Sequence, residues 1–314
     1  MSDSALGVRY GPVMASPTPL SSTAVVWTRG HGCLELAELL SPGEPVRAAG
    51  DLDEAVIAAR AELVVSRRLS SSFSLASQVV PVSFDAGAAQ AVVAAVAGGP
   101  HSPLAARVAA RLGVALGVPA MMVCAHRDEE DRDDAVSQIE RLYGEVPHIE
   151  YRLVEAEDAA GVVEQLPANA AIVLGAPGGS WLQRTFFGQG VRLRQQAPAG
   201  AIVVRQAPLR VFHRMGDPVF VGPLREAVDI LRVHGETVLA VVDRAMLVGI
   251  MRRSALELAD PGILVTELME EPRSVLLTAE LGAAAELRPA FAPAPIPVTD
   301  GEGRLVGGLE LPAD

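Results

Sequence analysis

The stretch that decides the fold is Ala170-Ala-Ile-Val-Leu-Gly175-Ala-Pro-Gly178, which is followed after nine further residues by Gly188-Gln189-Gly190. The apolar run 170–174 has the length and composition of a buried strand. The glycines predict a tight loop at the carboxyl end of that strand, and a helix is expected to open at Val191. Backbone N–H groups in such a loop, together with the positive end of a helix, favour an anion. The pattern therefore predicts a ligand-binding loop on a parallel sheet.

Four further apolar runs complete a predicted sheet. They cover residues 91–97, 119–125, 149–154 and 201–205. Between the first two, apolar residues recur every four positions from Leu104 to Leu116, which is typical of one face of a helix. Strands that alternate with helices of this length indicate parallel βαβ units whose sheet is covered on both faces. We therefore predict a three-layer α/β domain over residues 85–208.

The segment before this domain has a weaker pattern of the same kind. Strands are predicted at 24–27, 62–66 and 78–84, and helices at 33–40 and 51–60. Residues 61–84 loosely parallel residues 170–205. We therefore expect a degenerate α/β unit over 22–84, preceded by a loose proline-containing segment, 1–21. Because this unit has no glycine loop, we expect it to serve packing or dimerisation and to bind no ligand.

Composition narrows the classes of function. Half of the 314 residues are apolar, which excludes a mainly disordered chain. The 26 basic and 38 acidic residues give a net charge of −12, which opposes non-specific binding to nucleic acid or anionic lipid. Every basic residue is arginine, and a chain without lysine has neither a P-loop nor Schiff-base chemistry. No apolar run approaches the roughly 18 residues that span a bilayer, and no secretory signal opens the chain, so we expect a cytoplasmic protein that is not an integral membrane protein.

The last third of the chain repeats itself at an offset of 54 residues, because Met215-Gly-Asp-Pro218 is echoed by Met269-Glu-Glu-Pro272. Each copy continues with a strand, a helix and a hairpin whose second strand carries Leu-Val-Gly, at 247–249 and 305–307. A repeat of this size predicts two copies of one supersecondary unit that pack against each other. Residues 209–314 are therefore expected to form a pair of small domains.

The spacing of the glycines from 175 to 190 resembles the ATP-binding loop of universal stress proteins. The likeness covers roughly residues 90–206 and includes the turn Gly98-Gly99-Pro100-His101-Ser102. It implies a parallel-sheet fold of the adenine nucleotide α-hydrolase type that dimerises, with adenine near the ends of the first two strands and phosphates on the glycine loop. Ala97 stands where the family has an adenine-binding aspartate, and Gln189 replaces a serine or threonine. The candidate nucleotide contacts are Gly98, Gly99, Ser102, Cys124, Gly175, Gly178, Gly179, Gly188, Gln189 and Gly190.

The C-terminal repeat resembles a cystathionine-β-synthase (CBS) domain pair, a family that binds AMP, ATP, S-adenosylmethionine or cyclic di-AMP in clefts between the copies. The resemblance places the family's phosphate and ribose contacts on Arg252 and Ala255 in the first copy and on Glu310 and Ala313 in the second. Neither ribose-binding aspartate is present, and Glu310 would repel an anion. The remaining candidates for a phosphate contact are Arg252, Arg253, Ser254 and Arg273. The alternative interpretation of Arg252 and Arg253 is that they form a solvent-exposed pair at the end of a helix and bind no phosphate.

Three other groups of residues have a structural and a chemical interpretation. His126 with the acidic run 128–134 could chelate a hard cation, but carboxylates also favour the first turn of a helix, which is the interpretation we prefer. The aromatic residues Trp181, Phe186 and Phe187 could wall a base or pack the glycine loop. His31 and Cys33 lack further ligands at metal spacing, so no metal site is predicted.

Together these patterns predict a homodimeric regulatory protein of the stress response, not an enzyme, that senses ATP, AMP or cyclic di-AMP and requires no cofactor, with magnesium as a companion of the ligand. The alternative is a regulatory subunit or scaffold that docks on a membrane transporter, such as a cation/proton antiporter, with degenerate ligand sites. A slow ATPase is the least favoured, because no general base or acidic magnesium site accompanies the glycines.

Overall fold

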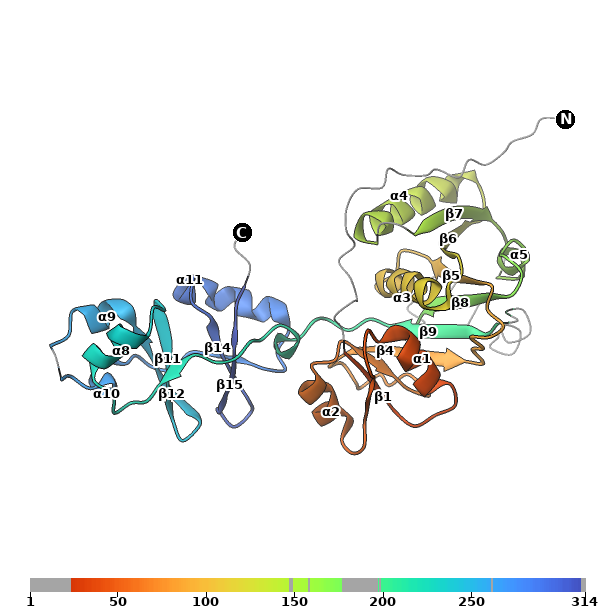
Figure 1. The fold of residues 1–314 in the computed structure, drawn as a ribbon. Coiled ribbons are helices and arrows are strands. Elements are labelled where there is room, and N and C mark those ends of the chain that lie inside the picture. Colours follow the sequence, from red (N-terminus) through yellow and green to blue (C-terminus); the bar gives the residue numbers. More distant parts are fainter. Residues whose placement is uncertain are drawn as a thin grey trace. The chain divides into compact units, whose positions relative to one another are not determined.

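The chain divides into two compact units, Met1–Ala207 and Pro208–Asp314 (Figure 1). The computed structural model describes residues 24–146, 149–157, 159–176, 197, 199–260 and 262–311. The predicted loose segment 1–21 and most of the predicted glycine loop lie outside the described residues. Each unit is considered by itself below.

A single nine-stranded sheet forms the first unit, in the order β2-β1-β3-β4-β9-β8-β5-β6-β7. Its second half consists of β5 (Ala91–Val96), β6 (Ala120–His126), β7 (Glu150–Glu155), β8 (Ala170–Gly175) and β9 (Ala201–Arg205). All neighbours among these five strands are parallel, which confirms the large parallel sheet that the sequence predicts. Helices connect them in the way that βαβ units require.

The first half of the sheet consists of β1 (Val25–Trp27), β2 (Val46–Arg47), β3 (Leu63–Val65) and β4 (Ser77–Val82). These strands are also parallel to one another, but β4 pairs with β9 in the antiparallel direction. The segments 22–84 and 85–208, expected as separate units, therefore share one sheet. The sequence did not predict β2, because this exposed two-residue strand exists only through its pairing with β1.

The two halves of the sheet have equivalent topologies. In the first half β1 lies between β2 and β3, and in the second half β5 lies between β6 and β8. In each half the next strand lies on the inner side, toward the middle of the sheet, so β3 and β4 correspond to β8 and β9. The antiparallel meeting of β4 and β9 makes the two halves run in opposite directions across the junction. The faint likeness of residues 61–84 to 170–205 thus has a structural counterpart.

Helices cover both faces of this sheet. The bounds are α1 (Cys33–Leu40), α2 (Leu52–Ala59), α3 (Ser102–Leu116), α4 (Glu129–Glu145) and α5 (Ala159–Glu164). One continuous core lies under α1, α3 and α4 and includes Val92, Ala94 and Val96 of β5. The alternate residues of β5 face a second core that includes Val162 of α5. The alternation explains why β5 is apolar throughout.

The second unit contains two three-stranded sheets of the same order, β10-β11-β12 and β13-β14-β15. The first copy has η2 (Val211–His213), β10 (Phe220–Val221), α8 (Ala227–Val233), β11 (Val238–Asp243), β12 (Met246–Arg252) and α9 (Arg253–Glu257). The second has α10 (Val265–Leu268), β13 (Val275–Leu276), η3 (Leu281–Leu287), α11 (Arg288–Phe291), β14 (Ile296–Thr299) and β15 (Leu305–Leu309). In both sheets the first pair of strands is parallel and the second antiparallel, so the predicted repeat is confirmed.

In each copy, the segment before the first strand forms backbone hydrogen bonds with the last strand of the other copy's sheet. Gly216 of the first copy makes two backbone hydrogen bonds with Gly308 of β15, at 2.8 and 3.1 Å. Glu270 of the second copy makes the equivalent pair with Ile250 of β12, at 2.8 and 3.1 Å. Because each copy completes the other, the pair forms one packed unit. No helix in the described part of either unit has the length and apolar composition to cross a bilayer.

Candidate ligand-binding sites

The first candidate site lies at the carboxyl ends of β5 and β8. These strands are parallel neighbours, and Ala95 pairs with Leu174 near the end of both. From β5 the chain continues to β6 on one side, whereas β8 and β9 lie on the other side. Open α/β sheets bind ligands in the crevice at such a reversal of strand order, outside the carboxyl ends of the strands. The structure therefore brings Gly98, Gly99 and Gly175 to one edge of the sheet.

The turn after β5 requires glycine at Gly98. Its φ is +65°, and a Cβ there would lie 2.6 Å from Cδ of Gln138 on α4. The turn closes on α3, because the Ser102 N–H donates to the Gly99 carbonyl at 3.0 Å and the Ser102 hydroxyl accepts from the Ala97 N–H at 3.4 Å. Ser102 is buried, so its hydroxyl holds the turn. No signal in the sequence pointed to Gln138, because its contact with the turn depends on how α4 packs.

The glycine loop itself is described only at its first residues, Gly175 at the end of β8 and Ala176. The other candidates of this loop lie outside the described residues, as do the three aromatic residues proposed to wall a base; the candidates are Gly178, Gly179, Gly188, Gln189 and Gly190. Their arrangement therefore stays a prediction.

Cys124, another candidate, is placed in the core. It lies on β6 beside Val96, is 2% exposed, and belongs to the apolar cluster under α3 and α4. Burial raises the pKa of its thiol to about 11, so the group is neutral at physiological pH. Its observed contribution is packing.

His101 and Gln206 lie at the same sheet edge and were not among the predicted contacts. His101 Nδ1 accepts a hydrogen bond from the Gln206 N–H at 3.2 Å, which ties the end of β9 to the start of α3. Burial, and then the charge of Arg205, lowers the pKa of His101. The side-chain Oε1 of Gln206 is buried and has no hydrogen-bond partner within the described part of the chain. The sequence could have indicated His101, because it belongs to the turn Gly98-Gly99-Pro100-His101-Ser102.

The second candidate site lies in the C-terminal unit, where Arg252 and Arg253 follow β12. Arg252 Nε lies 2.7 Å from Glu270 Oε1, and its Nη1 donates to the Ala290 carbonyl at 3.3 Å. Arg253 Nε lies 2.8 Å from Glu257 Oε1, and its Nη1 donates to the His234 carbonyl at 2.8 Å. Both guanidinium groups therefore already have partners within the unit. An anion that approached Arg252 would compete with Glu270.

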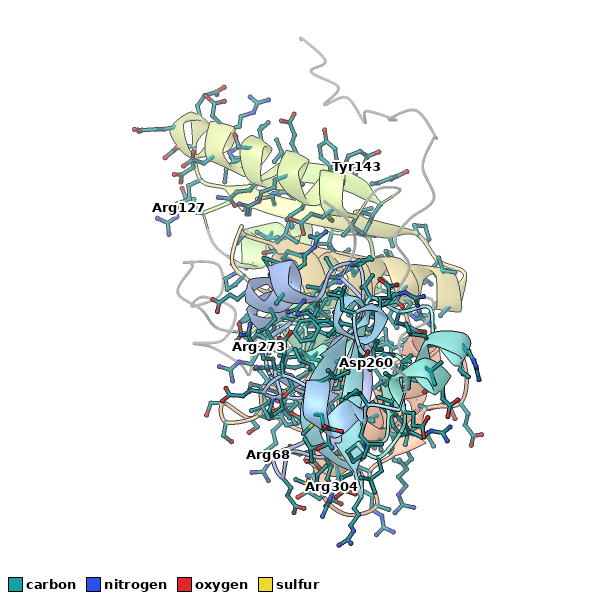
Figure 2. The ribbon with its side chains drawn as sticks, turned by 90° about the vertical axis from the view of Figure 1, so that its left-hand side faces the viewer. Arg68, Arg127, Tyr143, Asp260, Arg273 and Arg304 are labelled. Atoms are coloured by element: carbon teal, nitrogen blue, oxygen red, sulfur yellow. The ribbon has the colours of Figure 1, made fainter. Side chains whose placement is uncertain are left out.

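The other candidates of this unit lie on the surface. Ser254, Arg273 and Glu310 are exposed, and Ala313 lies outside the described residues (Figure 2, where Arg273 is labelled). Glu310 follows β15 directly, as Arg252 ends β12. The negative charge of Glu310 at the position equivalent to Arg252 opposes an anion in the second cleft.

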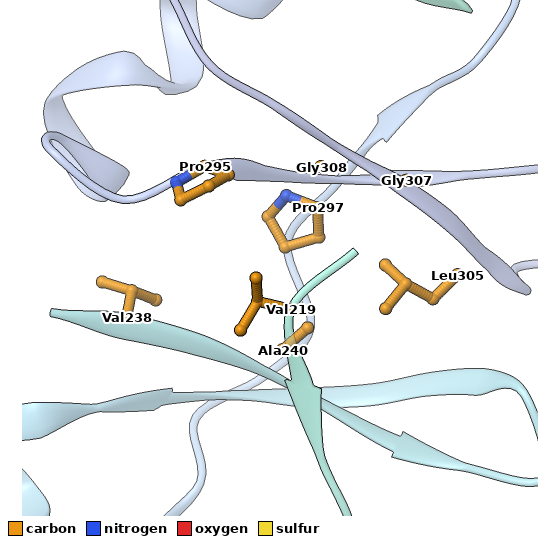
Figure 3. Close-up of a pocket in the computed structure, with 8 residues that line it drawn as sticks. All are labelled: Val219, Val238, Ala240, Pro295, Pro297, Leu305, Gly307 and Gly308. Atoms are coloured by element: carbon orange, nitrogen blue, oxygen red, sulfur yellow. The ribbon is translucent and has the colours of Figure 1, made fainter. Parts of the chain in front are cut away.

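A small cleft lies between the two sheets of the C-terminal unit (Figure 3). Equivalent positions of the two copies face it in pairs: Val238 with Pro295, and Ala240 with Pro297. Its volume is about 10 Å³, which is enough for about one water molecule. In this conformation the cleft is too small for a nucleotide, and its paired side chains are apolar.

The acidic run after His126 caps a helix. The Asp128 carboxylate accepts from the N–H groups of Glu130 and Asp131, both at 3.0 Å, at the start of α4. This confirms the helix-start interpretation of these carboxylates. Among the described residues, no group of three or more His, Cys, Asp or Glu side chains has the arrangement of a metal site.

Among solved structures, comparisons find CBS domain pairs that are similar to part of the chain. No protein-family model matches the sequence, and no curated protein matches it. Among solved structures, a CBS domain pair/ACT domain protein of Thermotoga maritima is 21% identical, covering 33% of this chain and 90% of that chain with a TM-score of 0.30. The CBS-pair protein CBSX2 of Arabidopsis thaliana, also solved with AMP, is 25% identical over 33% of this chain and 89% of that chain, with a TM-score of 0.30. The cytosolic domain of the Mg²⁺ channel MgtE in complex with ATP is 16% identical over 68% of this chain and 83% of that chain, with a TM-score of 0.30.

Proposed function

We propose that the protein is a regulatory protein, not an enzyme, that senses an adenine nucleotide at the carboxyl ends of β5 and β8. The observation that carries this proposal is the reversal of strand order between β5 and β8, with the left-handed turn at Gly98 after β5 and Gly175 at the end of β8. The left-handed turn at Gly98, the start of α3 and the buried Oε1 of Gln206 supply backbone N–H groups and a polar acceptor at one edge. The universal-stress-protein-like glycine spacing supports adenine nucleotides as the ligand class.

We further propose that the C-terminal CBS-like pair responds when a nucleotide occupies the site at β5 and β8. Its copies are interlocked through Gly216–Gly308 and Ile250–Glu270, so a shift of one copy changes the contacts of the other. A ligand that binds one arrangement more tightly shifts the population toward that arrangement. A nucleotide could enter the pair only after the apolar cleft widens and the Arg252–Glu270 ion pair opens.

Calorimetry of the full chain with ATP, AMP and cyclic di-AMP, each with and without magnesium, tests the proposal. The wild type is expected to bind one of them, and Gly98→Val is expected to weaken that binding strongly, because valine is strained at the φ of +65° and would displace the Gln138 side chain beside the turn. Gly117→Val is the matched control, since Gly117 also has a positive φ of +67° but faces open space. Absence of heat with every ligand, or equal binding by the Gly98 variant, would overturn the proposal.

The remaining interpretations give different results in the same preparation. Steady release of phosphate from ATP would indicate an ATPase. Recovery of the chain with membranes, without nucleotide binding, would favour docking on a transporter. In the described part of the first unit, the exposed large apolar side chains are Leu34, Val46 and Val114, on three different elements, and give that interpretation no specific support.

A further inference from the structure

The first half of the nine-stranded sheet has a reversal point of its own, at β1 and β3. From β1 the chain continues to β2 on one side and then returns to β3 on the other. All three strands are parallel, so the carboxyl ends of β1 and β3 lie at the same edge. By the rule that applies to β5 and β8, this edge is a place where an α/β sheet receives a ligand.

Three arginines follow these two strand ends. Trp27 pairs with Val65 at the end of the register, and the Thr28 N–H donates to the Val65 carbonyl at 3.0 Å. Arg29 lies two residues after the end of β1, and Arg67 and Arg68 lie two and three residues after the end of β3. The pairing therefore brings the three arginines to one edge of the sheet.

The side chain of Arg67 crosses from the β3 end to the turn that starts α1. A Cβ built on Gly30 would lie 2.2 Å from Cγ of Arg67, so only glycine leaves room for this crossing. Burial raises the pKa of the Cys33 thiol and the charge of Arg67 opposes that rise, which places the guanidinium near the first residue of α1. The Ncap residue of α1, Gly32, provides no side-chain cap for the helix N–H groups.

The three guanidinium groups are available to a ligand. Arg29, Arg67 and Arg68 are exposed, and none makes a side-chain hydrogen bond or ion pair with the described part of the chain (Figure 2, where Arg68 is labelled). On α4, by contrast, Arg132 lies 3.1 Å from Glu129. Glu35 in the first turn of α1 is exposed, and no contact joins it to the three arginines.

The loop that carries Arg67 and Arg68 is held in place. The Ser66 hydroxyl donates to the Arg68 carbonyl at 2.9 Å. Further along, the buried amide of Gln78 accepts from the Ser70 N–H at 2.7 Å and donates to the Ser70 carbonyl at 2.8 Å. A fixed backbone reduces the entropy that a ligand must remove on binding.

We propose that Arg29, Arg67 and Arg68 bind the phosphoryl group of a small phosphorylated molecule at this edge. Guanidinium groups match phosphate oxygens with paired, charge-assisted hydrogen bonds, and their planar shape suits a phosphoryl group better than a point charge does. The site is separate from the nucleotide site at β5 and β8 and does not depend on it. It departs from our expectation that this half binds no ligand, which rested on the absence of a glycine loop.

Calorimetry of the full chain with pyrophosphate tests this proposal. The wild type is expected to bind pyrophosphate, and Arg67→Gln/Arg68→Gln is expected to weaken binding by at least about tenfold through loss of two charged contacts. The comparison is made in the Gly98→Val background, in which the other site is disrupted. Arg132→Gln is the control, because it removes a half-buried arginine of α4 in the same unit. It is expected to bind pyrophosphate as its Gly98→Val parent does. Binding should also weaken as salt is raised, because the arginines are exposed.

The same set of variants identifies the source of the phosphoryl group. If Gly98→Val binds ATP more tightly than pyrophosphate, the ligand of the arginine edge is a nucleotide; if the two bind equally, the phosphate groups alone are recognised. No binding of pyrophosphate by the wild type would overturn the proposal. So would equal binding by Arg67→Gln/Arg68→Gln, or an equal loss in Arg132→Gln, which would indicate a general charge effect.

Discussion

Gly249 of β12 lies directly beneath Met269 of the other copy. A Cβ on Gly249 would lie 2.8 Å from Sδ of Met269 and 2.8 Å from the Glu270 carbonyl oxygen. The equivalent Gly307 has the same relationship with Met215, whose Sδ would lie 2.9 Å away. The repeated methionine and the repeated Leu-Val-Gly, which look unrelated in the sequence, are therefore two sides of one reciprocal contact. This contact requires glycine because a methionine and a backbone pass over it.

The first prediction follows from this contact. Gly249→Val is expected to destabilise the C-terminal unit by about 1–3 kcal/mol, because the added methyl groups force Met269 and the Glu270 backbone away from β12. Faster hydrogen exchange at the amides of Ile250 and Glu270 would report the loss. Gly235→Val, at a position with open space within 4 Å, is the control and is expected to exchange like the wild type. Unchanged protection in Gly249→Val would contradict the reciprocal contact.

The second prediction concerns the junction of the two halves of the large sheet. Gly200 has a φ of +77°, and a Cβ there would lie 2.1 Å from the Ser83 carbonyl oxygen just after β4. Gly200→Ala is therefore expected to lower the free energy of unfolding of the first unit by at least about 2 kcal/mol. Gly117→Ala has a similar φ of +67° without a neighbour, so it isolates the cost of the backbone conformation.

Tryptophan fluorescence during urea unfolding measures this effect in the first unit alone, because both tryptophans, Trp27 and Trp181, lie before residue 208. The Gly200 variant should unfold at a clearly lower urea concentration than the Gly117 variant. Equal midpoints for the two variants would show that the close approach of Gly200 to β4 does not constrain the junction.

The third prediction is a pH dependence at His101. Because the folded state lowers the pKa of His101, the unfolded chain takes up this proton more readily than the folded chain. The contribution to stability is therefore present above the unfolded pKa, about 6.5, and is lost as the pH falls through the lowered folded value. Protonation also removes the acceptor for the Gln206 N–H.

Urea unfolding at pH 7.5 and at pH 5.5 tests this dependence. His101→Gln keeps a hydrogen-bond acceptor at both pH values, so the difference in stability between them should be smaller than in the wild type. His31→Gln replaces an exposed histidine in the turn after β1 and should leave the difference unchanged. A His101→Gln protein with the full wild-type difference would rule out His101 as its source.

The sequence predicted most of the elements but not how the first two segments join. Apolar alternation and helical periodicity located β5, α3 and α1 to within one or two residues, because each of these signals is local. The antiparallel pairing of β4 with β9 was not predictable, since it depends on a contact between residues far apart in the chain. The two-residue strand β2 was missed for the same reason.

The candidate sites show the same limit. Gly98 and Gly175 were predictable as neighbours, because parallel strands place their carboxyl ends together. The contact of Gln138 with Gly98 was not, since it comes from the packing of α4. The resemblance suggested Cys124 as a ligand contact, whereas the side chain points into the core from β6. Alternation alone does not tell which face of a doubly covered strand receives a ligand.

The last prediction concerns the two thiols. Cys33 and Cys124 are both buried, and burial raises the pKa of each, that of Cys124 to about 11. At pH 8 only about 0.1% of a thiol with this pKa is the reactive thiolate. A disulfide reagent is therefore expected to modify neither cysteine of the native chain within minutes, and both after unfolding in guanidinium. Cys124→Ser should leave a single reactive thiol after unfolding. Rapid modification of native Cys124 that a bound adenine nucleotide blocks would instead return this residue to the ligand site.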